Sequence, residues 1–341
     1  MLNQVYRLVS PRQFEVQIVN EPMRDETIIV RPTYLSICMA DQRYFTGERD
    51  KKVMAKKLPM SLIHEGVGKV IYDPKGEYKK GDRVIMVPNT PMESDPIINE
   101  NYLKTSKFRS SGYDGYTQDY VFLRRDRAVL VPEGVEEPVA AYMELFSVAM
   151  HAITRMEAKR NGNQKVYGVW GDGSLGYLTS LILKYLYPEA QVNVFGKNSQ
   201  KLDYFSFADN VYYIDEIPAE MELDHVFECV GGRGSRSAIE QAIQFIKPEG
   251  TISLLGVTEY PVEIDTRLVL EKGLTLFGSS RSGRQDFQNS VDFISQHEPV
   301  QAYLNNLIGK VITIEKVTDI IQAFEFDLGN AWGKTIMKWE I

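Results

Sequence analysis

Hydrophobic and polar positions follow two different patterns along the chain, and the change falls near residue 146. Up to residue 145, apolar residues form short runs, for example at 27–32, 66–72 and 82–88, and turn residues such as Pro and Gly separate them. Few stretches in this part have helical spacing. The pattern predicts a mainly β domain over residues 1–145, with a barrel-like arrangement.

From residue 146 to 281, short apolar strands alternate with amphipathic helices. A β-branched and aromatic run at 166–170 is followed by a helical pattern and then by a second short strand at 192–195. This alternation predicts an α/β fold with a doubly wound parallel sheet, a Rossmann domain over 146–281. Residues 282–341 end in a strand-like segment, and we expect them to return and complete the first domain.

The turn after the first of these strands has the sequence G-x-G-x-x-G in a strand–turn–helix setting. Gly171 permits the tight turn, Gly173 lets the backbone approach a pyrophosphate, and Gly176 lets the helix pack close to the strand. Ser174 and Leu175 begin the helix, where free N–H groups and the helix dipole favour an anion. These five residues are therefore predicted to bind a dinucleotide; the alternative is a glycine-rich turn in another α/β sheet.

The end of the second strand indicates which dinucleotide to expect. NAD-dependent enzymes carry Asp or Glu about 20 residues after the last glycine, but Gly196 and Lys197 stand there, and Lys201 follows. No carboxylate in this stretch repels a 2′-phosphate, and two ammonium groups can pair with one. We therefore expect NADP(H) bound by Lys197 and Lys201, unless both lysines belong to an ordinary solvated loop.

Composition and charge narrow the class of protein. The chain has 341 residues with 43% hydrophobic and 25% charged content, which suits a two-domain globular protein, and its net charge of −7 argues against a general nucleic-acid binder. No segment approaches about 18 uninterrupted apolar residues, and the N-terminus lacks a signal core. Cys38 and Cys229 are too few for a disulfide framework. We expect a cytoplasmic protein without a membrane span.

Residue types that bind zinc occur at Cys38, at the adjacent pair His64 and Glu65, and at Glu144. A thiolate, an imidazole and one carboxylate make three protein ligands and leave a fourth position for water or substrate. Taken singly, each has an ordinary explanation as a small buried thiol, a structural histidine or a surface charge. Glu144, however, interrupts an apolar stretch in which an unpaired carboxylate is costly to bury.

These segments resemble the medium-chain, zinc-dependent alcohol and polyol dehydrogenases. The resemblance is carried by Cys38-Met39-Ala40-Asp41, Ile63-His64-Glu65-Gly66-Val67-Gly68-Lys69-Val70, Lys80-Gly81-Asp82-Arg83-Val84 and Glu144-Leu145-Phe146-Ser147-Val148. It implies a GroES-like catalytic domain, a homodimer, and a catalytic zinc on Cys38, His64 and Glu144. Glu65 is implied to stand beside the metal or to alternate as a ligand. A carboxylate as third ligand is similar to the sorbitol dehydrogenase branch.

The sequence departs from this family at two places. Residues 89–109, where the family often carries four cysteines around a structural zinc, contain none, so we expect one catalytic ion and no structural zinc. Ala40 and Arg43 stand where the family often has a hydroxyl and a histidine that relay the substrate proton. The proton route is therefore left open.

Further segments are similar to one group within the family, the ribulose-5-phosphate reductases (ribitol-5-phosphate 2-dehydrogenases) of bacterial teichoic acid or capsule synthesis. They include residues 58–68, 86–91, 108–112, 227–235 and 276–283. The resemblance implies that NADPH reduces the C2 carbonyl of D-ribulose 5-phosphate to D-ribitol 5-phosphate. It also implies work beside a cytidylyltransferase that makes CDP-ribitol.

A phosphorylated substrate needs a cation near the metal. Arg43 and Arg109 are candidates for bidentate phosphate binding, against the alternative of a surface arginine or an ion-pair partner. Lys56, Lys57 and Lys104 are weaker candidates.

Three other functions remain open. The same zinc chemistry could act on an unphosphorylated polyol such as sorbitol or xylitol. A zinc-free quinone or enoyl reductase has the same architecture, and a non-catalytic NADPH-binding scaffold could hold a partner enzyme. The last two would normally lack Cys38, His64 and Glu144.

Overall fold

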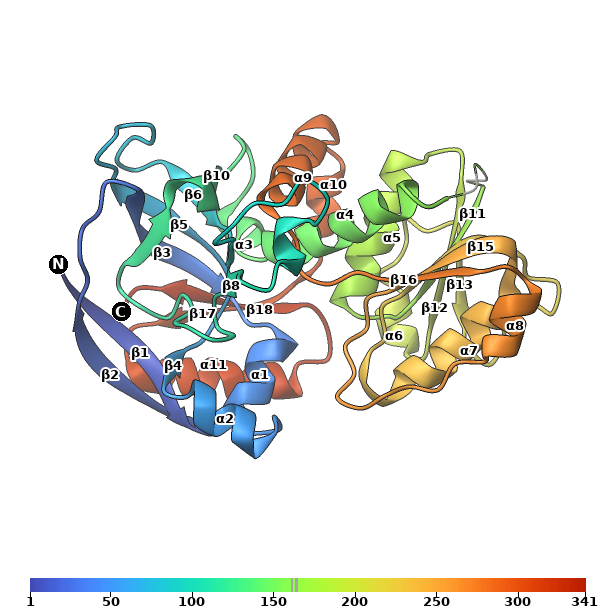
Figure 1. Ribbon diagram of the computed structural model, residues 1–341, viewed down its shortest axis with the longest axis horizontal. Coiled ribbons are helices and arrows are strands. Elements are labelled where there is room, and N and C mark those ends of the chain that lie inside the picture. The colour runs from blue at the N-terminus through green and yellow to red at the C-terminus, as the bar shows by residue number, and fades with distance from the viewer. Residues whose placement is uncertain (161, 163–164) are drawn as a thin grey trace. The chain divides into compact units, whose positions relative to one another are not determined.

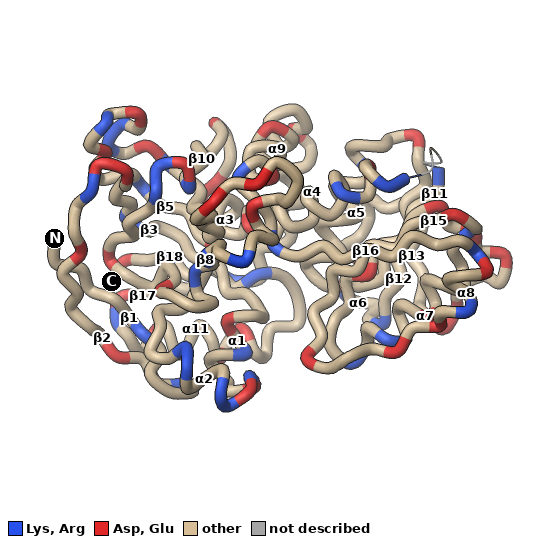
Figure 2. Tube along the Cα trace, in the orientation of Figure 1, with Lys and Arg blue, Asp and Glu red and all other residues tan. Residues whose placement is uncertain are grey.

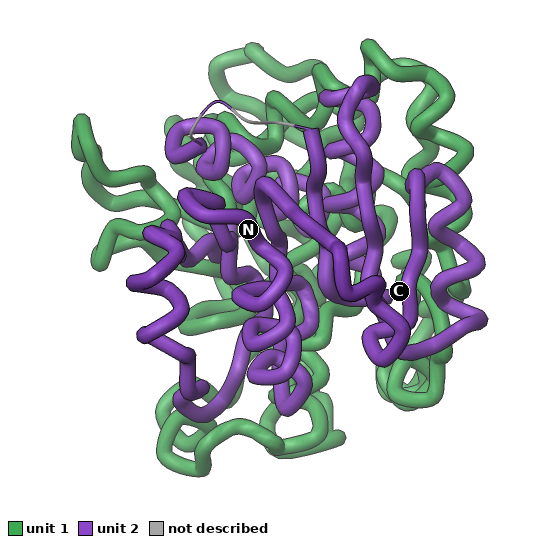
Figure 3. Tube along the Cα trace, turned by 90° about the vertical axis from the view of Figure 1, so that its right-hand side faces the viewer, with its two compact units in different colours: residues 1–144, 282–341 green, residues 145–281 purple. Residues whose placement is uncertain are grey.

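The computed structural model of the chain describes residues 1–160, 162 and 165–341. These residues form two compact units (Figure 3): unit 1 contains residues 1–144 and 282–341, and unit 2 contains residues 145–281. Within the described ranges, no helix has the length and apolar character needed to cross a membrane.

Unit 1 is built on a seven-stranded sheet in which the last strand of the chain lies beside an early one (Figure 1). β18 runs antiparallel to β3, with Ile336 opposite Ser36, and β5 pairs with the other edge of β3. The strands of this sheet are β3 (Thr27–Ser36), β5 (Glu65–Tyr72), β6 (Arg83–Met86), β9 (Val121–Arg124), β10 (Ala128–Leu130), β17 (Ile308–Ile314) and β18 (Lys334–Trp339). Smaller sheets are formed by β1 (Leu2–Ser10), β2 (Gln13–Asn20) and β4 (Met60–Ser61), and by β7 (Asn89–Thr90) and β8 (Lys107–Phe108).

Buried apolar side chains hold the helices of unit 1 against these sheets. Phe45, at the end of α1, stacks on Phe324 of α11 with ring centroids 4.7 Å apart, and both rings are fully buried. This contact fixes α1, which begins directly after Cys38, against the C-terminal helix. The helices that lie in unit 1 are α1 (Met39–Phe45), α2 (Lys51–Lys57), α3 (Glu137–Ala140), α9 (Arg284–Gln296), α10 (Val300–Asn305) and α11 (Val317–Gly329), with short 3₁₀ turns η1 (Glu100–Tyr102) and η2 (Arg125–Arg127); α4 (Met143–Glu157) begins in unit 1 and continues into unit 2.

Unit 2 is a parallel sheet of six strands in the order β13-β12-β11-β14-β15-β16. The strands are β11 (Val166–Trp170), β12 (Gln191–Gly196), β13 (Asn210–Tyr213), β14 (Leu223–Glu228), β15 (Ile246–Leu254) and β16 (Thr275–Gly278). They are connected through α5 (Ser174–Leu186), α6 (Ser199–Leu202), η3 (Gly232–Gly234), α7 (Ser235–Phe245) and α8 (Thr266–Glu271).

The strand order of unit 2 reverses at β11, because the chain builds outward to β12 and β13 and then returns to β14. Open α/β sheets bind ligands at the carboxyl ends of the strands beside such a reversal. The stacking of Trp170 on Phe195, with centroids 4.0 Å apart, packs the carboxyl ends of β11 and β12 together. The glycine-rich turn follows Trp170, so the fold places it at this point.

Candidate functional site

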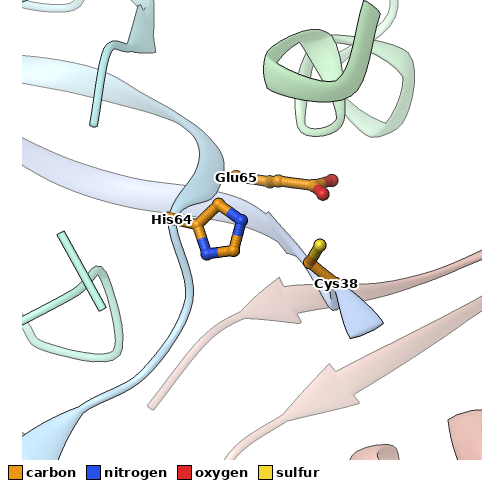
Figure 4. Close-up of side chains that lie close together, drawn as sticks. All are labelled: Cys38, His64 and Glu65. Atoms are coloured by element: carbon orange, nitrogen blue, oxygen red, sulfur yellow. The ribbon is translucent and has the colours of Figure 1, made fainter. Parts of the chain in front are cut away.

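Three of the four zinc-ligand candidates from the sequence lie together in unit 1 (Figure 4). Cys38 follows β3 and precedes α1, while His64 and Glu65 stand at the start of β5. Because β3 and β5 are antiparallel neighbours with Ser36 opposite Glu65, the end of one strand meets the beginning of the other. One ligand atom from each of Cys38, His64 and Glu65 lies within 4.8 Å of the other two.

The carboxylate of Asp41, in α1, holds the His64 ring. Its Oδ1 accepts hydrogen bonds from the Ile63 N–H at 3.1 Å and the Ser110 hydroxyl at 2.5 Å, and its Oδ2 lies 3.3 Å from His64 Nδ1. Burial lowers the pKa of His64, but Asp41 and the Cys38 thiol outweigh this and raise that pKa well above its usual value. With Nδ1 engaged by Asp41, Nε2 is left for a metal ion.

Lys334, the first residue of β18, neutralises the charge of Glu65. Its ammonium lies 3.0 Å from Oε1 and 2.9 Å from Oε2 of Glu65, and both side chains are buried. Burial lowers the pKa of Lys334, but the carboxylate raises it more, so the net shift is upward. The positive charge of Lys334 and the negative charge of Glu65 therefore compensate each other.

Glu144 is buried in the first turn of α4 but is not part of the three-residue group. Burial, with the charge of Glu65, raises its pKa to about 7, although His64 and Lys334 act in the opposite direction. The protein thus only partly stabilises the ionised form of Glu144. A metal cation close to Glu144 would lower this pKa and favour the ionised carboxylate.

The donor set fits a zinc ion. A thiol, an imidazole and carboxylates favour zinc, whereas Mg²⁺ and Ca²⁺ prefer oxygen ligands alone. Burial and Glu65 also raise the pKa of the Cys38 thiol. Ionised Cys38 and Glu144 would therefore both be stabilised by a divalent cation.

The predicted dinucleotide turn has the backbone that its glycines require. Gly171 has φ +132°, and a Cβ at Gly176 would lie 2.0 Å from the Gly171 carbonyl oxygen. A Cβ at Gly173 would meet nothing within 4 Å, so the chain there faces open space. Ser174 and Leu175 form the first turn of α5.

The glycine-rich turn after β11 contains a carboxylate, Asp172, that the sequence argument overlooked and that contacts the loop after β12. Asp172 Oδ2 accepts the backbone N–H groups of Lys197 at 2.8 Å and Asn198 at 2.9 Å. A Cβ at Gly196 would lie 2.8 Å from Asp172 Cβ. Asp172 therefore occupies the place where an acidic residue at 196 would stand, and its charge is directed at two N–H groups. Lys197 is exposed and Lys201 half-buried.

The two arginines proposed for a phosphate differ in their surroundings. Arg109 is buried and donates to the backbone carbonyls of Asp114 at 3.2 Å and Phe122 at 2.6 Å, with its guanidinium over the Tyr113 ring. Two of its N–H groups are thus used within unit 1, while its buried Nε has no hydrogen-bond partner among the described residues, and a role in phosphate binding stays a prediction. Arg43 lies half-buried in the last turn of α1.

Sequence reasoning did not identify Asp41 and Lys334 as parts of the site. Asp41 carried one signal, a carboxylate that follows Cys38 within a segment that the structure buries. Lys334 carried none, because its partner Glu65 lies 269 residues away in the chain.

Comparison with known proteins shows the family to which the chain belongs. Residues 24–133 match the alcohol dehydrogenase GroES-like domain, and residues 200–296 match the zinc-binding dehydrogenase domain. The chain therefore belongs to the zinc-binding dehydrogenases with a GroES-like domain and is an oxidoreductase.

More particular similarities extend over the full length. The chain is 55% identical to the ribulose-5-phosphate reductase of Bacillus spizizenii over 100% of both chains, and 56% identical to ribulose-5-phosphate reductase 1 of Staphylococcus aureus over 99% of both. The NADPH complex of S. aureus TarJ matches with a TM-score of 0.90 at 50% identity, covering 100% of each chain. The predicted family and fold class are confirmed; the individual ligand and cofactor-binding residues stay predictions.

Proposed function

We propose that this chain is an NADPH-dependent, zinc-assisted reductase that converts D-ribulose 5-phosphate to D-ribitol 5-phosphate. Its similarity over the full length to proteins named ribulose-5-phosphate reductase carries the proposal. Cys38 and His64, which lie together with Glu65 in unit 1, offer a thiol and an imidazole to zinc, and the turn at Gly171–Gly176 suits a dinucleotide. The product would feed CDP-ribitol and ribitol-phosphate polymer synthesis, as the sequence resemblance implies.

Several residues of unit 1 have different roles at the proposed metal site. We assign Cys38, His64 and Glu144 as zinc ligands, because Glu65 already pairs with Lys334. Zinc bound there supplies a Lewis acid for the C2 carbonyl, while NADPH supplies the hydride. Asp41 orients the His64 ring through Nδ1, and burial of these side chains keeps water from weakening their electrostatic effect.

The same proposal includes a homodimer in the cytoplasm that works beside a cytidylyltransferase. Its support is the resemblance of the sequence to the family, in which dimers are common. Light scattering of the purified protein would give the oligomeric state, and co-purification with the cytidylyltransferase would test the association.

The function is tested by NADPH oxidation with D-ribulose 5-phosphate and with unphosphorylated D-ribulose. We expect rapid oxidation with the phosphate ester, and loss of both activity and bound zinc in Cys38→Ser. The matched control is Cys229→Ser, because Cys229 lies in unit 2 beside Thr179, outside the metal group. Equal rates with both sugars would contradict the proposed substrate, and full zinc content in Cys38→Ser would contradict the ligand assignment.

A further inference from the structure

Two cations share the ring of Tyr44 in unit 1. The Arg49 guanidinium carbon lies 4.5 Å and the Lys57 ammonium 5.7 Å from the ring centroid. Lys57 Nζ also donates to the Tyr44 hydroxyl at 3.0 Å and to Ser111 Oγ at 3.3 Å. We call Tyr44, Arg49, Lys57 and Ser111 the Tyr44 cluster. Lys57 ends α2, in which four of seven residues are lysines, drawn blue in Figure 2.

Among the described residues, no carboxylate pairs with the two cations of this cluster. In the part of the chain that the structure describes, neither Arg49 nor Lys57 forms an ion pair with a carboxylate, and the buried Nε of Arg49 has no hydrogen-bond partner. The neighbouring Asp50 does not supply the charge, because its carboxylate accepts the N–H groups of Lys52 and Val53 at the start of α2. Two adjacent cations and an unused donor favour an anion.

The Tyr44 cluster is connected to the metal group through short contacts. Ser111 follows Ser110, whose hydroxyl donates to Asp41, and Asp41 also contacts His64. Tyr44 lies on the same short helix as Asp41. A chain of contacts within unit 1 therefore joins the cluster to the ligands.

We propose that the Tyr44 cluster binds the phosphate group of the substrate, which makes the enzyme selective for a sugar phosphate over a free sugar. This inference rests on the proposed function. Arg49 supplies a fork of N–H donors, and Lys57 supplies a point charge. The half-buried Ser111 contributes a hydroxyl that can donate to a phosphate oxygen, and the buried Tyr44 holds the two cations in place. Arg109 is not part of the cluster, because its guanidinium lies over the Tyr113 ring and both of its Nη atoms donate to backbone carbonyls.

The test compares Lys57→Met with Lys56→Met, since the two lysines are neighbours on one helix but Lys56 is exposed and outside the cluster. In Lys57→Met we expect the KM for D-ribulose 5-phosphate to rise by about 10- to 100-fold, the size of a charged hydrogen bond. kcat/KM for unphosphorylated D-ribulose and the zinc content should not change. Lys56→Met should behave as the wild type with both sugars.

A second variant and a second probe keep the test decisive if Lys57→Met folds poorly. Arg49→Gln should show the same selective loss, and inorganic phosphate should inhibit D-ribulose reduction by the wild type but not by Arg49→Gln. An equal loss with both sugars, or equal behaviour of the two lysine variants, would overturn the inference. If the wild type reduces both sugars equally, the proposed substrate is refuted. The anion site itself would still stand if phosphate inhibits the wild type but not the Arg49 and Lys57 variants.

Discussion

Asp41 links three backbone segments at the level of single residues. The Asp41 carboxylate contacts the His64 ring, the backbone N–H of Ile63, which is the residue before His64, and the hydroxyl of Ser110. Ile63 and Ser110 have φ values of +71° and +56°, which are unfavourable for residues with a side chain and above all for a β-branched one. The contacts to Asp41 stabilise this backbone, so one buried carboxylate determines where His64 lies.

We expect Asp41→Asn to lower the affinity for zinc by about 10- to 100-fold, because the His64 ring loses its charged partner. The side chain keeps its size, so the fold should persist. Competition with a fluorescent zinc chelator would measure the affinity, with circular dichroism as a check of folding. The control is the exposed Asp25→Asn, and an unchanged affinity in Asp41→Asn would refute the orienting role.

The part of the site that the sequence could predict consists of residues with informative neighbours. Cys38 and His64 stand in recognisable segments, and Glu144 interrupts an apolar run. Lys334 could not be found in this way, because its role depends on the antiparallel pairing of β18 with β3 and of β3 with β5. The carbonyl partners of Arg109 could not be predicted either, because the hydrogen bond to Phe122 depends on how β9 lies in the fold.

At the scale of elements, the strand–turn–helix of β11 and α5 was predictable, because the spacing of its apolar residues and the positions of its glycines both indicate the same structure. The short helices α1 and α2 were not placed by the sequence. In α2, Met54 is the only buried side chain, so no apolar stripe signals a helix. The interaction between the glycine turn and the loop after β12 was also hidden, since Asp172 reaches that loop only when β11 and β12 are adjacent.

Asp172 allows a test of how the two turns cooperate. In Asp172→Ala, the N–H groups of Lys197 and Asn198 lose their acceptor, and we expect NADPH to bind about 3- to 10-fold more weakly, with little change for NADH. Asp172→Asn should bind NADPH as the wild type does, because one amide oxygen can accept both bonds. Fluorescence titration with each cofactor measures the constants. An equal loss for NADPH and NADH would place the effect at the pyrophosphate instead.

At the scale of the whole molecule, the loop of residues 89–109 is held without cysteine ligands. The Glu100 carboxylate accepts a bond from Arg127 Nη1 at 2.7 Å and from the backbone N–H of Arg284 at 2.6 Å, and its carbonyl accepts the Ser106 hydroxyl at 2.6 Å. These contacts connect the loop to η2, between β9 and β10, and to the start of α9 within unit 1. Ion pairs and hydrogen bonds thus stabilise a segment that carries a structural zinc in many relatives, as the family resemblance implies.

Removal of zinc should therefore abolish the reaction without unfolding the protein. Each described unit has its own apolar core, and the group that fits a metal joins only the start of β5 to the end of β3. We expect about one zinc per chain by elemental analysis, and loss of ribulose 5-phosphate reduction on chelation with an unchanged circular dichroism spectrum. Activity should return when zinc is added back.

The matched comparison is Glu100→Gln, which leaves the metal group untouched. It should keep its zinc and its activity at low temperature but lose about 1–2 kcal/mol of stability, because Arg127, almost fully buried, loses one of its two charged partners and keeps only Asp126. A second zinc per chain, or cooperative unfolding on chelation, would show that a metal stabilises the fold and would contradict this account of the loop.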